Sequence, residues 1–96
     1  MPERPKKLTF EGIKSDITDG WSFEEKKNAI VKEFTLHSFS SAAEFIGKIA
    51  LIANEQDHHP DIFLHDYKKV KIILSTHDAG GVTSNDLKLA KAIDAI

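Results

Sequence analysis

Residues 69–77 show the alternation that most constrains the fold of this chain. Successive side chains of a β-strand point to opposite faces of a sheet, so a period of two separates a buried face from an exposed one. One face of this stretch carries Val70, Ile72, Leu74 and Thr76. The other face carries Lys71, Ile73, Ser75 and His77. The pattern predicts a strand that directs His77 away from the face that the aliphatic side chains bury.

Three further stretches have strand character. Residues 62–67 precede the alternating stretch and form a hairpin-like pair with it. Residues 21–25 and 30–37 form a second pair across a short polar segment. In 30–37, Ile30 and Phe34 fall on one side and Val31 on the other, which again indicates a period of two. The chain is therefore expected to contain four strands in two pairs.

Helix signals precede, separate and follow these pairs. Thr9 is suited to the N-cap of a short helix, which we expect to end at Asp19-Gly20, because glycine favours a left-handed C-terminal position. The other two helices begin at capping boxes, in which a Ser or Thr precedes an acidic residue by three positions. These boxes are Ser41 with Glu44 and Thr83 with Asp86. The middle helix runs to about Gln56, and its core stripe is Ala42, Phe45, Ile46, Ile49 and Ala53.

The order of elements is α-β-β-α-β-β-α. It predicts an α+β fold of two layers, a four-stranded antiparallel sheet with helices packed on one face. A chain of 96 residues allows one domain. We expect residues 1–7, which hold two prolines among charged residues, to be a flexible lead, and residues 8–96 to form the single domain.

Composition excludes several classes of protein. The formal net charge is −2 and most basic residues are scattered, which argues against direct binding to nucleic acid. The chain has no cysteine, so it has neither a disulfide framework nor a thiolate metal site. No apolar run approaches the roughly 18 residues of a membrane span, and the first residues lack the pattern of a signal peptide. A cytoplasmic protein is expected, with the nucleus also open to a chain of this size.

Two polar clusters stand at predicted strand ends. Asp57-His58-His59-Pro60-Asp61 precedes the third strand, and Ser75-Thr76-His77-Asp78 ends the fourth. Proline disfavours a helical conformation in the residue before it, so His59 should be extended at the strand entrance. Imidazole exchanges protons near neutral pH. A helix C-terminus explains one histidine at most, so the three together predict acid–base chemistry on a small molecule.

A metal site is the main alternative for these histidines. It would combine His58 or His59 with His77 and an aspartate, Asp57 or Asp61, but the spacing matches no metal-binding signature. Trp21 leaves two interpretations open, since it is suited either to stack on a flat heterocycle or to pack in the core.

The residues also resemble a known family. The run from Glu55 through the His-His-Pro motif at 58–60, and the run Leu74-Ser-Thr-His-Asp, are similar to the pterin-4a-carbinolamine dehydratases. Gly20-Trp21, Tyr67, Val70, Gly81, Asp86 and Ala90 extend the resemblance over nearly the whole chain. Each motif alone is weak, and the two at this separation are specific.

The resemblance implies an activity. Members of the family dehydrate 4a-hydroxytetrahydropterin, the product of aromatic amino-acid hydroxylases, to quinonoid dihydropterin, without metal or cofactor. Three histidines carry the activity, and they match His58, His59 and His77. By the same analogy His58 and His77 are the acid–base pair and His59 mainly binds substrate. Further substrate contacts are expected from Asp57, which is also suited to orient His58, and from Pro60, Ser75, Thr76, Asp78 and Trp21.

The resemblance has two departures. Many relatives carry an acidic residue four positions before the first histidine, where this chain has Asn54 followed by Glu55. If that carboxylate orients a histidine, its role is weakened, lost or moved to Glu55. The segment between Pro60 and Tyr67 is one residue longer than the short family form, and we expect a β-bulge to absorb the extra residue.

Partners other than the pterin follow from the helix and from the family. The apolar face around Phe45, Ile46, Ile49 and Ile52, which Leu51 widens, is expected to pack between subunits of a homodimer or homotetramer. Animal relatives also act as dimerisation cofactors of a homeodomain transcription factor. The alternative function is therefore a binding module without catalysis, although nothing in this sequence encodes such a partner.

Overall fold

A computed structural model describes residues 6–17 and 20–96 of the chain. Of the predicted lead, residues 1–5 lie outside the described part. The elements are α1 (Phe10–Asp16), β1 (Ser22–Glu24), β2 (Ala29–Thr35), α2 (Phe39–Gln56), β3 (Asp61–His65), β4 (Lys69–Leu74), the 3₁₀ turn η1 (His77–Ala79) and α3 (Ser84–Asp94). None of the helices in the described part is both long and apolar enough to span a membrane.

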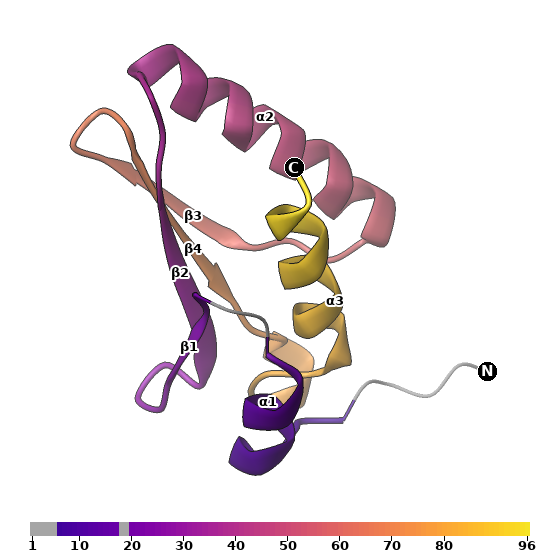
Figure 1. Cartoon of the computed structure of the whole chain (residues 1–96). Helices are drawn as coiled ribbons and strands as arrows, with labels where there is room; N and C mark the ends of the chain where they lie inside the picture. Colours follow the sequence, from indigo (N-terminus) through magenta and orange to yellow (C-terminus); the bar gives the residue numbers. More distant parts are fainter. Residues whose placement is uncertain (1–5, 18–19) are drawn as a thin grey trace.

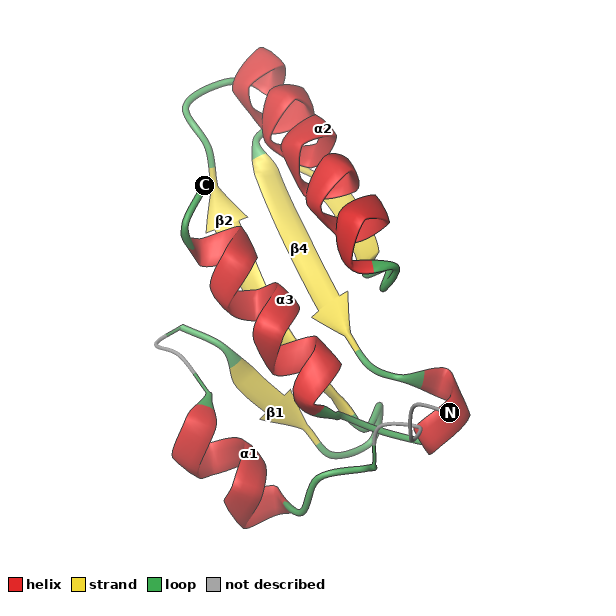
Figure 2. Cartoon of the chain, turned by 90° about the vertical axis from the view of Figure 1, so that its right-hand side faces the viewer, coloured by secondary structure: helices red, strands yellow, loops and turns green. Residues whose placement is uncertain are grey.

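The four strands form one antiparallel sheet in the order β1-β2-β4-β3. All three helices lie on one side of it, with α2 and α3 across the sheet and α1 beside β1 (Figures 1 and 2). The predicted α+β class, the antiparallel sheet and the placement of the helices are confirmed. The other side of the sheet carries no helix in the described part of the chain, and we refer to it as the open face.

The core lies between the sheet and the helices. The strand residues that face the helices are fully buried: Ile30, Val70, Ile72 and Leu74. They pack against the predicted stripe of α2 and against α3, including Ala42, Phe45, Ile49, Leu89 and Ile93. The alternation of residues 69–74 therefore places alternate side chains in the core, as the sequence predicts, and leaves Ile73 and its neighbours for the open face.

Two predicted helix boundaries were wrong. Helix α1 ends at Asp16, with an extended Ile17 as its C-cap, rather than at Asp19-Gly20. Gly20 does have a positive φ of 90°, but it lies beyond the helix. Helix α2 begins a turn earlier than expected, because the side chain of Ser38 accepts a hydrogen bond from the backbone N–H of Ser41 at 3.1 Å. Ser41 is thus inside the first turn and is not the cap.

The predicted ends of the third and fourth strands also need correction. Strand β4 stops at Leu74, whose partner in β2 is Ile30, and not at His77. Strand β3 pairs with β4 without interruption, so its ladder contains no bulge. The irregular backbone lies instead in the turn, where Asp66 and Tyr67 have φ values of 49° and 54°.

The expected subunit face of α2 is only partly available. Phe45 and Ile49 are 8% and 0% exposed and belong to the core of their own chain, so they do not form a surface. Leu51 is 71% exposed and lies with Ile52 beside the C-terminal end of α3. Assembly into a dimer or tetramer stays a prediction.

The position of the N-cap of α2 is testable. We expect Ser38→Ala to lower the free energy of unfolding by about 1 kcal/mol, because it removes the side chain that caps the helix. Ser41→Ala should cost less, since it keeps the backbone N–H that the cap accepts from and loses only the hydroxyl contact with Ser38 at 3.0 Å. Chemical denaturation of both variants measures the difference. Equal losses, or a larger loss for Ser41→Ala, would contradict this assignment.

Candidate active site

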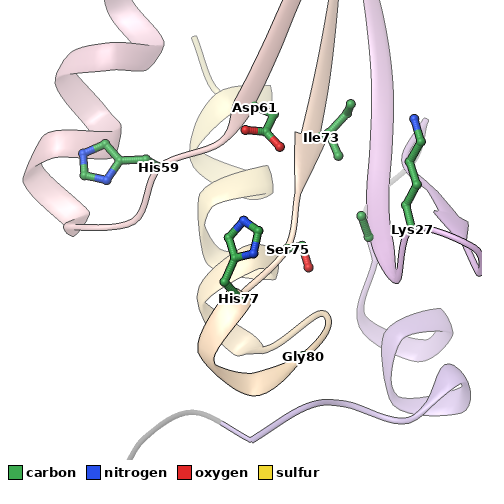
Figure 3. A pocket seen from close by; sticks show the side chains of 8 residues that line it. Lys27, His59, Asp61, Ile73, Ser75, His77 and Gly80 are labelled. Carbon is green, nitrogen blue, oxygen red and sulfur yellow. The ribbon is translucent and has the colours of Figure 1, made fainter.

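The predicted polar clusters meet at one end of the sheet, where α2 ends, β3 begins and β4 leads into η1 (Figure 3). Asp57 ends α2 in a left-handed conformation, with φ 52° and ψ 42°. The backbone N–H of His58 still donates to the carbonyl of Ala53 at 3.1 Å. This sharp turn allows two adjacent histidines to approach one site, which a fully extended chain would not.

Two adjoining hollows contain most of the predicted site residues. The larger, of about 520 Å³, is lined by Lys27, Ala29, His59, Asp61, Ile73, Ser75, His77 and Gly80. The smaller, of about 270 Å³, is lined by Asp57, His58, His59, Ser75, Thr76, His77 and Asp78. His59, Ser75 and His77 line both. The structure thus brings together the three histidines and four of the six residues expected to contact substrate, in a space of the size that small molecules occupy.

His77 reaches the hollows from η1 and not from a strand. It shares the lining of the larger hollow with Ile73 and Ser75, the residues two and four positions before it. His77 therefore lies on the predicted side of the sheet, away from the buried aliphatic residues, although strand β4 ends before it. An isolated bridge between Thr76 and Gly81 closes the loop that carries the histidine.

His58 is anchored by a carboxylate that sequence reasoning did not assign to the site. Its Nε2 lies 2.5 Å from Oδ1 of Asp86, whose side chain is fully buried. An ionised carboxylate only accepts hydrogen bonds, so we assign the proton of this contact to Nε2. Nδ1 is then the ring nitrogen left for proton exchange. Asp57, expected to orient this ring, lies exposed at the helix end instead.

Asp86 is held by further contacts. Its Oδ2 accepts from the hydroxyl of Thr76 at 2.9 Å and from the backbone N–H of Thr83 at 2.9 Å. The second contact belongs to the predicted capping box at the start of α3, which is confirmed. The carboxylate also lies in the first turn of a helix, where negative charge is favoured. One side chain therefore caps α3 and fixes a histidine.

His59 has a different neighbour. Its Nε2 lies 3.0 Å from Oδ1 of Asn54, one turn back on α2. At the position where the family resemblance implies an acidic residue, the amide oxygen of Asn54 thus contacts a histidine ring. Among the described residues, the neighbouring Glu55 makes no contact that would orient either histidine ring.

Two predicted contact residues lie elsewhere. Trp21 is 6% exposed, packs edge-on against Phe34, and donates from Nε1 to Oδ2 of Asp94 at 3.0 Å. Trp21 is therefore a core residue, which is the second of the two interpretations that the sequence left open. Pro60 lines neither hollow; it sets the path of the chain into β3.

The remaining histidine of the β3 segment is outside the site. His65 stacks on Phe63 and contacts the carboxylate of Glu33 on the open face. Within residues 6–17 and 20–96, no group of three or more His, Asp and Glu side chains is placed to hold a metal ion.

Comparison with known proteins identifies the family. The family model described as pterin 4 alpha carbinolamine dehydratase matches residues 6–96. The chain belongs to this family. Its reaction removes water, which makes the chain a hydro-lyase.

Individual relatives agree with this family. Proteins of Rhodopseudomonas palustris and Sulfurisphaera tokodaii, both named provisionally as pterin-4-alpha-carbinolamine dehydratases, are 43% and 44% identical over 93 residues. The matches cover 95% of this chain in both cases, and 91% and 97% of the relatives.

Solved structures support the fold. A protein from Brucella melitensis, described as a transcriptional coactivator/pterin dehydratase, superposes with a TM-score of 0.87 at 35% identity, over 94% of this chain and 97% of its own. A pterin dehydratase-like protein described as a RuBisCO assembly factor in the alpha-carboxysome has a TM-score of 0.66. It is 22% identical over 79% of this chain and 87% of its own, and shows likeness of fold alone.

The role of Asp86 is testable by one isosteric change. In Asp86→Asn the amide oxygen is able to keep the capping contacts, while the amide nitrogen faces His58 and favours the ring with a bare Nε2. A neutral ring with a bare Nε2 carries its proton on Nδ1, so Nδ1 can no longer accept one. We therefore expect kcat for dehydration to fall at least about tenfold with little change in KM.

The matched control is Asp66→Asn, the same change in the exposed turn before β4. It should keep the wild-type rate, and thermal melting should show both variants folded. Wild-type kcat in a folded Asp86→Asn variant would show that the carboxylate does not act through His58.

Proposed function

We propose that this chain dehydrates 4a-hydroxytetrahydrobiopterin to quinonoid dihydrobiopterin and water by acid–base catalysis at His58, His59 and His77, and so supports tetrahydrobiopterin recycling. The observation that carries the proposal is the convergence of three imidazoles on two adjoining hollows, one of them anchored on a buried carboxylate. Family membership supplies the reaction.

The reaction matches what imidazoles do. The C4a–O bond breaks while N5 loses its proton, and the electrons of the N–H bond form the C4a=N5 double bond. An acid protonates the departing hydroxyl and a base takes the N5 proton, so the products are water and the quinonoid ring. No electron is transferred to or from the protein. Groups that exchange protons near neutral pH contribute about 10²–10⁴-fold to such steps.

The surroundings of the three histidines indicate which catalytic role each one has. His58 has one nitrogen committed to Asp86, so it exchanges protons through the other. His77 is exposed at the start of η1 and lines both hollows, which suits the second member of an acid–base pair. His59 also lines both hollows and is held by Asn54. We assign it mainly to substrate binding.

A second function is favoured by one comparison. The Brucella protein, 35% identical to this chain, is described as a transcriptional coactivator as well as a pterin dehydratase. A binding role for this chain is thus an alternative that does not exclude catalysis. A scaffold alone has no physical need for the two exposed imidazoles of His59 and His77 in the same hollows.

The catalytic assignment predicts the effect of removing each imidazole. We expect His59→Ala and His77→Ala each to lower kcat/KM for dehydration at least about tenfold, which corresponds to about 1.4 kcal/mol or more of barrier. The measurement is the decay of chemically generated 4a-hydroxytetrahydrobiopterin, with the uncatalysed rate subtracted.

His37→Ala is the matched control, because His37 is exposed and lines neither hollow. It should match the wild type. The assignment fails if both site variants retain wild-type efficiency, and the proposed function itself fails if the wild-type protein does not accelerate the decay.

A further inference from the structure

Asp61 places a carboxylate inside the larger hollow. It is the first residue of β3 and pairs with Ile73 of β4. Directly opposite residues of neighbouring strands project to the same face, so these two side chains lie next to each other on the open face. Figure 3 shows the carboxylate between His59 and Ile73 and above the ring of His77. A strand holds it, which fixes its position relative to both imidazoles.

This carboxylate has no protein partner among the described residues. Neither a hydrogen bond nor an ion pair is found for its side chain there. Lys27 lines the same hollow, but its ammonium group lies 3.7 Å from Glu24. The acceptor capacity of Asp61 is therefore available to a ligand.

The rest of the hollow suits a flat ring. Ile73 and Ala29 give its lining an apolar part, while the polar groups come from the histidines, Ser75 and Asp61. The smaller hollow differs, since every residue that lines it is polar. Asp78 also offers a carboxylate there, but no aliphatic side chain lines that hollow beside it. A heterocycle with one apolar face and one edge of N–H donors fits the surroundings of Asp61 better.

A pterin has such an edge. Its N3–H and its 2-amino group are adjacent donors that point the same way, and a carboxylate accepts two parallel hydrogen bonds of this kind. We propose that Asp61 recognises the N3–H and 2-amino edge of the substrate and selects 2-amino-4-oxo pteridines over rings without the amino group. The inference rests on the proposed function, and it names the part of the substrate that this site reads.

The proposal has a kinetic consequence. In the substrate the donor edge lies across the pyrimidine ring from C4a, whose bond to oxygen breaks, and takes no part in the proton transfers. An interaction that is equal in the ground state and the transition state affects KM and leaves kcat unchanged. Asp61 would therefore differ from the histidines, whose removal lowers kcat.

The test compares two ligands on three variants. Calorimetry measures the binding of 7,8-dihydro-6-methylpterin and of 7,8-dihydro-6-methyllumazine, which has a carbonyl in place of the 2-amino group. The wild type should bind the pterin at least about tenfold more tightly, since a carbonyl facing the carboxylate replaces a donor. Asp61→Asn should reduce that ratio below about threefold and raise KM, with kcat nearly unchanged. The control Asp66→Asn should keep the wild-type ratio, and Asp78→Asn tests the other carboxylate of the site.

Each outcome has one meaning. An unchanged ratio in a folded Asp61→Asn variant overturns the proposal, as does a ratio that falls in Asp78→Asn instead. A fall in kcat alone also overturns it, because Asp61 would then act on the reacting atoms. If the wild type binds the pterin with the expected preference but does not accelerate dehydration, the recognition by Asp61 stands and the proposed function fails. If the wild type binds neither ligand, the recognition by Asp61 fails, whatever the rate of dehydration.

Discussion

The buried carboxylate of Asp86 is the interaction on which the site depends. It joins three parts of the chain: the N-terminus of α3 through Thr83, the loop after β4 through Thr76, and the end of α2 through His58. A charge without solvent contact is tolerated only when its hydrogen bonds are made, so these contacts are required together. The same requirement that stabilises the start of α3 therefore fixes the ring of a proposed catalytic histidine.

The sheet separates stability from chemistry. Val70, Ile72 and Leu74 face the helices and are fully buried, while Ile73, between them, lines the larger hollow on the open face. Because adjacent residues of a strand face opposite sides, the residues on the open face are separate from the packing between the sheet and the helices. Different side chains can therefore replace His59, Asp61 and Ser75 while the buried face of the sheet maintains the fold.

Local signals were predictable from the sequence and distant contacts were not. The alternation in β4 and the capping box of Thr83 and Asp86 depend on neighbours a few residues away, and both are confirmed. The contact from Asp86 to His58 joins residues 28 apart, and only the packing of α3 against the sheet creates it. Ser41 was mistaken for a cap because its spacing to Glu44 is the same whether or not Ser38 precedes it.

The tautomer of His58 tests the central claim most directly. Long-range ¹H–¹⁵N correlation spectra of the wild-type protein, recorded where the ring is neutral, distinguish a protonated Nε2 from a protonated Nδ1. The account predicts one ordered ring with the proton on Nε2, because Asp86 only accepts. A ring protonated on Nδ1, or one that averages between the two tautomers, would show that the buried carboxylate does not hold this histidine for catalysis.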